Sequence, residues 1–314
     1  MPEEAPKKRT YTKWVKSGTK FYPRADSTEQ LTVDAGFYDA YYSPIGPMLN
    51  PIPLKTDNLL ELEDSPVANA FAGIRKFWES KQKFVDFGLV HKRGILFHGV
   101  PGGGKSAAVL LLVNELVKAN GVVMRMDTDY FHEIRALCRA LREIEPDRAL
   151  TVLIEDLDIF AMTKDRQTGM PMVTALLSFL DGEDQVGNIV TLATTNYLER
   201  LDARLLNRPS RFDEIVNIGL PSIAMRRSYL KQVCPTLSIK QLEDLAFRSD
   251  GLMVAHLREL VIATQVLGMN VDATLMRLKQ MTVNQLEADK QRTAKVVSPA
   301  VQRMFEAAAE KFGL

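Results

Sequence analysis

The chain has 314 residues, of which 46% are hydrophobic and 25% charged, and its 40 basic and 39 acidic side chains leave a formal net charge of +1. This length fits roughly two domains of about 150 residues, and the composition excludes wholesale disorder, a collagen-like repeat and a generally basic nucleic-acid binder. The longest apolar run, residues 107–113, is far shorter than the ~20 residues of a membrane helix, and no secretory leader follows Met1. The two cysteines, Cys138 and Cys234, form no metal or disulfide pattern, so we expect a cytoplasmic, reducing location.

The nearly neutral total hides a basic N-terminus. Residues 1–24 carry seven basic and two acidic side chains, a local balance of +5. We expect a flexible tail that either aids solubility alone or docks on an acidic partner or on nucleic acid. Residues 25–65 mix aromatic residues with closely spaced prolines, which predicts an extended, irregular segment.

Residues 66–220 predict an α/β domain. A helix is expected over residues 66–87, where apolar side chains recur at spacings of three and four. Short apolar segments then alternate with helical ones, which is typical of a parallel sheet covered on both faces. The expected strands are residues 95–97, 122–126, 151–154, 189–195 and 214–218. The expected helices between them are residues 105–120, 130–144 and 173–180.

After Pro221 the strand pattern gives way to helical periodicity. We expect a smaller, all-helical domain over residues 221–290 and a C-terminal segment over residues 291–314. The helices of the smaller domain are predicted at residues 222–233, 238–247, 252–268 and 271–289. A last helix is expected from about Pro299 to Phe312.

The most specific motif joins the first predicted strand to the helix that follows it. Residues 99–106 are GVPGGGKS and match the Walker A pattern G-x-x-x-x-G-K-[ST]. Glycines in such a loop let backbone N–H groups point at phosphate oxygens, and the helix N-terminus adds its dipole. Lys105 is expected to bridge the β- and γ-phosphates, and the Ser106 hydroxyl to ligate Mg²⁺. The pattern predicts a nucleoside-triphosphate site held by Gly99, Pro101, Gly102, Gly103, Gly104, Lys105 and Ser106.

Two adjacent acids, Glu155 and Asp156, follow an apolar strand about 50 residues after this loop. A strand beside the loop's own strand would bring them to the γ-phosphate edge. There one acid holds the Mg²⁺ hydration shell and the other polarises the attacking water. An acid pair can also simply mark where a strand leaves the core, but its position relative to the loop favours a Walker B pair.

Together these motifs resemble those of the AAA ATPases of the AAA+ superfamily. The loop, the acid pair, residues 194–196 (TTN) and residues 208–213 (RPSRFD) occur in the order seen in that family. Residues 77–94 and 175–182 are most similar to its Bcs1-like branch and the bacterial and viral relatives of that branch. The resemblance covers roughly residues 68–265.

The resemblance implies a P-loop domain with a five-stranded parallel sheet, a helical lid, and a homo-oligomeric ring, usually a hexamer, with ATP and Mg²⁺ between subunits. Asn196 then corresponds to sensor 1, whose amide positions the attacking water. Arg208 and Arg211 correspond to arginine fingers, which reach the ATP of the neighbouring subunit. The alternative for these arginines is ordinary pairing with nearby acids.

Two of the departures from the family pattern concern the predicted site residues. The acids stand in the order Glu155-Asp156 rather than Asp-Glu, a swap that is also characteristic of the Bcs1-like branch. By register Glu155 takes the Mg²⁺ role and Asp156 activates water, with the reverse assignment open. Ser210 replaces the common glycine between the two arginines, which leaves open which arginine is the principal finger.

The residues that would contact a substrate are harder to identify from the sequence than those of the ATP site. Ring translocases place an aromatic residue on the loop between the second strand and the second helix, where this chain has Tyr130 and Phe131. This loop is short and lacks the usual following glycine. A pore role therefore stands beside the alternative that Asp129 caps the helix and an aromatic enters the core.

The function that fits these motifs best is an ATP-hydrolysing ring that remodels or translocates a protein client. One alternative is a nucleic-acid-associated motor or loader, which the basic tail favours, although no zinc knuckle or long basic helix supports it. Another is a scaffold whose assembly is switched by ATP, which the complete hydrolytic set disfavours. No membrane insertion is expected.

Overall fold

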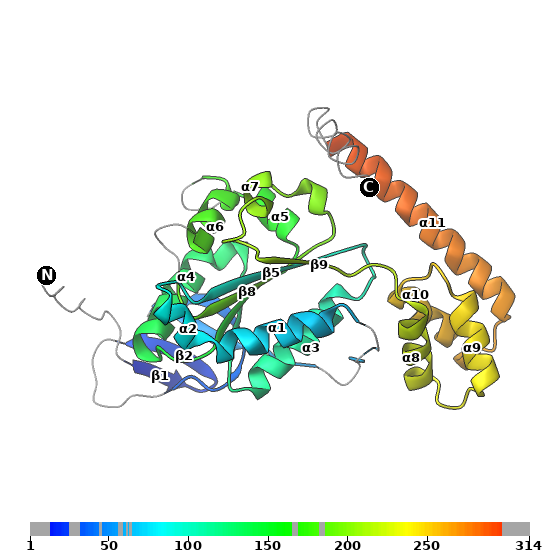
Figure 1. Cartoon of the computed structure of the whole chain (residues 1–314), viewed down its shortest axis with the longest axis horizontal. Helices are drawn as coiled ribbons and strands as arrows, with labels where there is room; N and C mark the ends of the chain where they lie inside the picture. Colours follow the sequence, from blue (N-terminus) through cyan, green and yellow to red (C-terminus); the bar gives the residue numbers. More distant parts are fainter. Residues whose placement is uncertain are drawn as a thin grey trace, which may run out of the picture.

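The computed structural model describes residues 13–24, 32–43, 46–55, 59–60, 62, 65–164, 169–181 and 186–296. Within them the chain forms an α/β domain followed by a helical lid (Figure 1). The helix expected at residues 299–312 and the first half of the expected basic tail lie outside the described residues. No helix among the described residues is both long enough and apolar enough to cross a bilayer.

One sheet organises the α/β domain. In the described residues it has nine strands, in the order β1-β2-β4-β3-β6-β7-β8-β5-β9. Five of them form the parallel core that the sequence predicts: β5 (Lys92–His98), β6 (Val122–Arg125), β7 (Leu150–Ile154), β8 (Ile189–Thr195) and β9 (Glu214–Asn217). Strands β7 and β8 are buried along their whole length, as expected where helices cover both faces.

The N-terminal strands correct the prediction of a flexible tail at residues 13–24, and they show that the extended segment predicted at residues 25–65 is in part regular strand. β1 (Lys13–Ser17) and β2 (Lys20–Arg24) form an antiparallel hairpin, and β4 (Gly46–Pro51) and β3 (Gly36–Ser43) continue the sheet up to β6. The five-stranded sheet is therefore extended by four strands, the last of which, β3, pairs in parallel with β6.

Aromatic burial explains why these residues fold. Trp14 is 0% and Phe21 3% exposed, so the hairpin adds a hydrophobic face to the core although basic residues flank both aromatics. The prolines do not prevent a strand, because Pro47 and Pro51 lie near the ends of β4 and β2 pairs with β4 only at Leu49. The prediction gave net charge and proline content more weight than the aromatic residues, which are what these strands bury.

Helices cover the sheet on both faces (Figure 1). One face carries α1 (Val67–Glu79) and α3 (Lys105–Lys118). The other carries α4 (Phe131–Ile144), α5 (Leu157–Met162), α6 (Met172–Asp181) and α7 (Ala203–Leu206). The single helix predicted over residues 66–87 is two helices, because the chain breaks at Ser80 before α2 (Lys81–Asp86). Helices α5 and α7 were not predicted, since such short helices show no periodicity.

The lid is built from α8 (Ile223–Val233), α9 (Ile239–Arg248), α10 (Val254–Val261) and α11 (Val271–Val296), with a π-helical turn, η3 (Ile262–Val266), continuing α10. Leucines with no exposed surface form its own core, among them Leu230, Leu257 and Leu278. α11 runs continuously through the predicted boundary at residue 290. The lid and the C-terminal segment are thus not separated by a break there.

Gly94 in β5 packs against the segment that bears the two arginines. Its N–H donates to Asp213 Oδ2 at 2.7 Å, and its carbonyl accepts from the Asp213 N–H at 2.9 Å. A Cβ at residue 94 would lie 1.9 Å from the Arg211 carbonyl oxygen. We expect Gly94→Ala to lower the free energy of unfolding by about 2–4 kcal/mol, measured by chemical denaturation.

Gly73 in α1 provides the control. A Cβ there meets nothing nearer than Glu214 Oε2 at 3.8 Å, so Gly73→Ala should raise the free energy of unfolding by up to about 1 kcal/mol. Equal stabilities of the two variants would contradict the close packing at Gly94.

Candidate nucleotide-binding site

The loop between β5 and α3 has a backbone that needs its glycines. Gly99, Gly102 and Gly104 have φ of +149°, +80° and +99°. A Cβ at residue 99 would lie 2.0 Å from the Ile218 carbonyl oxygen. Gly104 is the N-cap residue of α3 and no side chain caps this helix, which leaves its first N–H groups for a ligand. This geometry is that of an anion-binding loop.

Lys105 is folded over this loop. Its side chain is 6% exposed, and Nζ donates to the carbonyl oxygens of Gly99 at 2.8 Å and Val100 at 3.0 Å. Burial lowers the pKa of Lys105, while the nearby carboxylates of Asp156 and Asp158 raise it. The ammonium is thus held on the loop, within the electrostatic influence of Asp156 and Asp158, and a phosphate oxygen would replace the two neutral carbonyls. Ser106 follows it, exposed, in the first turn of α3.

The structure brings Asp156 and Asn196 together although they are far apart in the sequence. Asn196 Nδ2 donates to Asp156 Oδ1 at 3.2 Å, and the Asp156 N–H donates to Thr194 Oγ1 at 3.1 Å. Asp156 has a φ of +47°, a left-handed conformation that is uncommon outside glycine. Constrained backbone of this kind is frequent at functional sites. The end of β7 is thus fixed to the end of β8.

Glu155 faces a different set of groups from its neighbour. Its side chain is 39% exposed, and Oε2 lies 3.8 Å from Nη1 of Arg125, at the end of β6. Burial raises the pKa of Glu155, Arg125 lowers it, and Asp156 raises it. Glu155 and Asp156 therefore project to two different environments, as two separate roles require.

Asp158 is a site residue that the sequence reasoning missed. Its side chain is 4% exposed, and Oδ1 accepts from Thr195 Oγ1 at 2.6 Å. Thr195 Oγ1 in turn accepts from the Tyr197 N–H at 3.1 Å. This chain of bonds holds α5 against the residue before Asn196. The one indication of Asp158 in the sequence was its position two residues after the predicted acid pair.

The two arginines differ sharply in exposure. Arg211 is 7% exposed, and its guanidinium contacts both carboxylate oxygens of Asp181, at 2.8 and 3.2 Å, as well as the carbonyl of Arg204. Arg208 is 68% exposed and lies 3.6 Å from Asp181 Oδ2. Burial opposes ionisation of Asp181, yet its bonds to Arg211 and the charge of Arg208 lower its pKa overall. Arg211 is thus buried and held by contacts within its own chain, whereas Arg208 is exposed.

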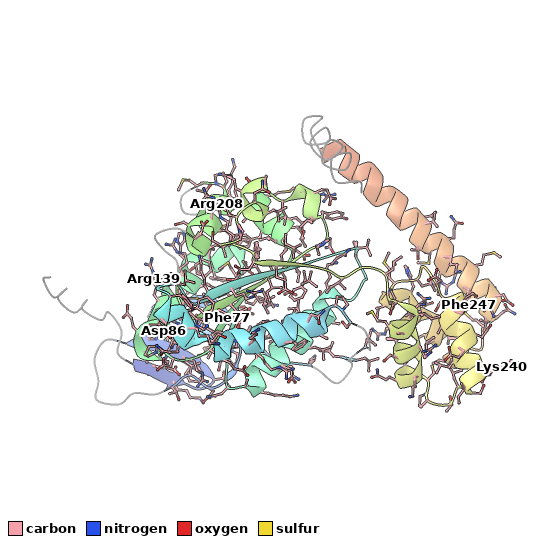
Figure 2. All side chains as sticks on the ribbon, in the orientation of Figure 1. Phe77, Asp86, Arg139, Arg208, Lys240 and Phe247 are labelled. Atoms are coloured by element: carbon pink, nitrogen blue, oxygen red, sulfur yellow. The ribbon has the colours of Figure 1, made fainter. Side chains whose placement is uncertain are left out.

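The arginines lie away from the loop of the same subunit. The Arg211 carbonyl packs against Gly94, near the N-terminal end of β5, whereas the glycine loop begins at Gly99, beyond its C-terminal end. At 3.3 Å per residue, these positions are roughly 16 Å apart. Figure 2 shows Arg208 on the outer surface near α6, remote from the lid. The exposed Arg208 therefore lies away from the glycine loop of its own chain.

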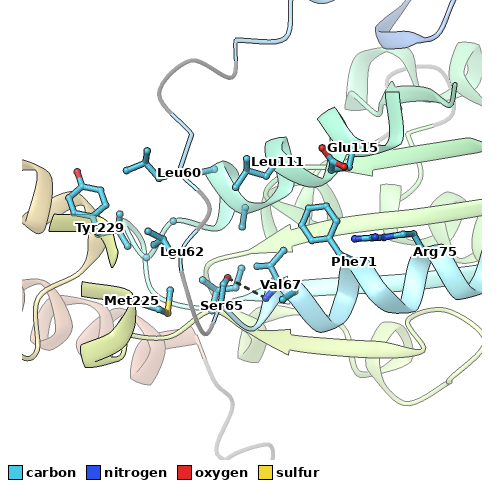
Figure 3. Close-up of a pocket in the computed structure, with 17 residues that line it drawn as sticks. Leu60, Leu62, Ser65, Val67, Phe71, Arg75, Leu111, Glu115, Met225 and Tyr229 are labelled. Carbon is cyan, nitrogen blue, oxygen red and sulfur yellow. Dashed lines mark hydrogen bonds between the residues drawn. The ribbon is translucent and has the colours of Figure 1, made fainter. Parts of the chain in front are cut away.

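An apolar cavity of about 320 Å³ lies beside the glycine loop, between α1, α3 and the lid (Figure 3). Leu60 and Leu62 line it from the segment before α1, and Met225 and Tyr229 from α8 (Figure 3). The lid also touches the loop directly, because the Ala255 N–H donates to the Gly102 carbonyl at 3.3 Å. The sequence reasoning missed this cavity, whose walls come from five separate segments.

The aromatic residues of the expected pore loop have partners within the subunit. Phe131 is 1% exposed, and its ring centroid lies 6.1 Å from that of Phe160 in α5. The Tyr130 ring lies 4.9 Å from that of Tyr41 in β3. The cap of the short 3₁₀ turn η1 (Thr128–Tyr130) is Asp127, which accepts from the Asp129 N–H at 2.9 Å, and not Asp129. The alternative in which an aromatic enters the core is confirmed for Phe131.

Comparison with known proteins gives a consistent assignment. The sequence model of the family described as "ATPase family associated with various cellular activities (AAA)" matches residues 95–220. The chain is 28% identical over 227 residues to the ATPase family gene 2 protein of Saccharomyces cerevisiae, a match that covers 65% of this chain and 29% of that protein. It is 28% identical over 209 residues to the Proteasome-activating nucleotidase of Methanosphaerula palustris, covering 62% and 50%.

A third relative is the ATP-dependent zinc metalloprotease FtsH of Ureaplasma parvum, 27% identical over 241 residues, covering 71% of this chain and 32% of that protein. The chain thus matches half or less of the length of these curated relatives. The fold and the glycine loop define a P-loop nucleoside-triphosphatase domain. More narrowly, residues 95–220 match the AAA family of ATPases.

Proposed function

We propose that this chain binds ATP with Mg²⁺ and hydrolyses it to ADP and phosphate within a homo-oligomeric ring, in the form of a hexamer. The observation that carries this proposal is the meeting of Lys105, Asp156 and Asn196 at one edge of the sheet, next to the glycine loop. A cation for the phosphates and a hydrogen-bonded carboxylate–amide pair for a water are the elements that phosphoryl transfer needs.

The donor groups of the site fit Mg²⁺ bound together with nucleotide. The described residues contain no cluster of three or more carboxylate, histidine or cysteine ligands that could hold a metal alone. Mg²⁺ typically binds through one or two protein oxygens together with substrate phosphates. The Ser106 hydroxyl and the Glu155 carboxylate would supply these oxygens, and the ion would neutralise charge on the transferred phosphoryl group.

Asp156 would then serve as the group that orients water and accepts its proton. Its hydrogen bond from Asn196 fixes the carboxylate, and the Asn196 amide keeps a second N–H for the water. The reverse assignment, with Glu155 as base, would place the base beside Arg125, whose positive charge disfavours proton acceptance.

The apolar cavity is the place we assign to the nucleoside. It adjoins Gly103 and Gly104, so a base there would lie next to phosphates held on the loop. Its walls include lid residues Met225 and Tyr229, which would couple nucleotide occupancy to the angle of the lid. The cavity of about 320 Å³ lies at the lower end of the range of small-ligand sites.

We assign the arginine finger to Arg208 alone. The ion pair of Arg211 with Asp181 supports it, because Asp181 also contacts Arg208. Arg208 is the exposed member of this cluster and lies far from its own loop. A ring in which each subunit presents Arg208 to the next subunit's ATP satisfies both facts, and the head-to-tail contact it requires closes into a ring.

A protein client is favoured over a nucleic acid. Two of the relatives carry names that refer to a proteasome and to a protease, and the folded hairpin at residues 13–24 leaves less of the basic tail free. The nucleic-acid alternative rests on the +5 balance of residues 1–24. The swapped order Glu155-Asp156 supports a place in the Bcs1-like branch.

Asp156→Asn tests the hydrolytic step separately from binding. The amide keeps the shape of the side chain but cannot accept a proton, so we expect turnover to fall by about 100-fold or more, with ATP affinity within a few-fold of wild type. The two quantities are measured by phosphate release and by equilibrium binding of a fluorescent ATP analogue. Affinity capture with this variant and ATP would then show whether a protein or a polynucleotide is retained.

Asp147→Asn is the matched control, because this exposed carboxylate pairs with Lys81 outside the site. It should leave turnover and affinity unchanged. Turnover of Asp156→Asn at the wild-type rate would exclude Asp156 from the chemistry.

A further inference from the structure

Arg125 links the N-terminal strands to the ATP site. In the parallel pairing of β3 with β6, Asp39 lies directly opposite Arg125. Nε and Nη2 of Arg125 donate to the two carboxylate oxygens of Asp39, both at 2.8 Å. This two-bond arrangement is the strongest geometry between a guanidinium and a carboxylate. The Asp39 side chain is only 17% exposed, so the pair is partly shielded from water.

The third nitrogen of the same guanidinium faces Glu155. Nη1 lies 3.8 Å from Glu155 Oε2, which is too long for a hydrogen bond but close enough for direct attraction. Asp127 also contributes negative charge at this position. Arg125 thus has two carboxylates within reach, and Asp39 holds it in the better geometry.

We propose that Asp39 tethers Arg125 at a distance from Glu155, and that the N-terminal strands thereby set how strongly Glu155 attracts Mg²⁺ at the ATP site. Asp39 and Arg125 act as positioning residues. The inference rests on the proposed ATP and Mg²⁺ site. Asp39 lies outside residues 95–220, so the tether comes from the N-terminal strands and not from the matched AAA segment.

Loss of Asp39 and loss of Arg125 should shift the Mg²⁺ dependence of nucleotide binding in opposite directions. Without the Asp39 carboxylate, Arg125 is free to close on Glu155 and to compete with Mg²⁺ for it. Without the Arg125 guanidinium, Glu155 loses a positive neighbour that repels Mg²⁺. When Arg125 is absent, removal of Asp39 should have little further effect, because the group that it tethers is gone.

The test is the Mg²⁺ concentration that half-saturates binding of a fluorescent, non-hydrolysable ATP analogue. We expect it to rise about threefold in Asp39→Asn and to fall about threefold in Arg125→Gln. The double variant should behave as Arg125→Gln alone. Asp34→Asn, a change to an exposed acid of the same N-terminal region that pairs with Lys16 at 2.5 Å, is the matched control and should show no shift.

Shifts of the same sign in both single variants, additive shifts in the double variant, or no shift at all would overturn the tether. Thermal melting establishes that each variant is folded, and Asp39→Ser replaces Asp39→Asn if the latter is not. The readout needs no turnover. A wild-type chain that binds the analogue but does not hydrolyse ATP would refute the proposed activity and leave the tether testable, whereas a chain that binds no nucleotide would overturn both.

Discussion

Replacement of Lys105 by alanine is expected to weaken ATP binding by about two orders of magnitude and to reduce hydrolysis below detection. Lys105 is the cation that the structure buries between the glycine loop and the acids, with Nζ on the Gly99 and Val100 carbonyls. A charge-assisted contact to phosphate in so shielded a place is worth several kcal/mol, of order 2.7–4 by comparison with other catalytic donors. Equilibrium binding of a fluorescent ATP analogue and phosphate release measure the two losses.

Lys118→Ala is the control for this variant, because Lys118 ends the same helix but is 64% exposed and pairs with Glu115 at 3.1 Å, outside the loop. It should bind and hydrolyse ATP as the wild type does. Lys105→Ala should also melt at or above the wild-type temperature, since it removes a buried charge. Wild-type ATP affinity in Lys105→Ala would refute the assignment of the loop.

Replacement of Arg208 by alanine is expected to reduce turnover by about 10³-fold while leaving ATP affinity and thermal stability nearly unchanged. Its guanidinium is exposed, and its ion pair within the described residues is a 3.6 Å contact with Asp181, so little folding energy depends on it. Arg211→Ala should behave differently. Breaking its buried pair with Asp181 should cost about 3–5 kcal/mol of folding stability, seen in denaturant unfolding.

Mixed assemblies separate a finger acting between subunits from one acting within a subunit. Arg208→Ala subunits retain an intact Asp156, and Asp156→Asn subunits retain an intact Arg208. If the finger acts on the neighbour, mixing the two inactive proteins should restore part of the hydrolysis at interfaces that combine both intact groups. No gain on mixing, despite demonstrated co-assembly, would place Arg208 outside the neighbouring site.

The parallel core and the glycine loop could be predicted because their signals are local. Apolar strands such as residues 189–195 alternate with helical periods, and the loop pattern fixes its own conformation through glycines with positive φ. Asp156 and Asn196 were each identified as site residues from the order of the motifs, although the hydrogen bond between them is a finding of the structure. These parts of the site need no knowledge of distant contacts.

The remaining features depend on contacts between segments far apart in the sequence. Arg211 is buried in an ion pair with Asp181, which lies thirty residues earlier in the sequence. The residues around Arg211 give no indication of this partner. Likewise the partner of Arg125 is Asp39, 86 residues earlier. Asp39 lies in a strand that was not predicted, because nearby prolines and basic residues favoured an irregular segment. The apolar cavity joins the segment before α1 to the lid, so it exists only when the domains are folded together.

If the chain hydrolyses ATP at sites completed by a neighbouring subunit, its turnover depends on assembly. The most direct test is turnover per subunit as a function of protein concentration, with assembly followed by light scattering in the same samples. We expect Mg²⁺-dependent turnover that rises steeply over the concentrations at which subunits associate and then levels off. Constant turnover per subunit across a range in which the protein stays monomeric, or no turnover in the assembled state, would contradict it.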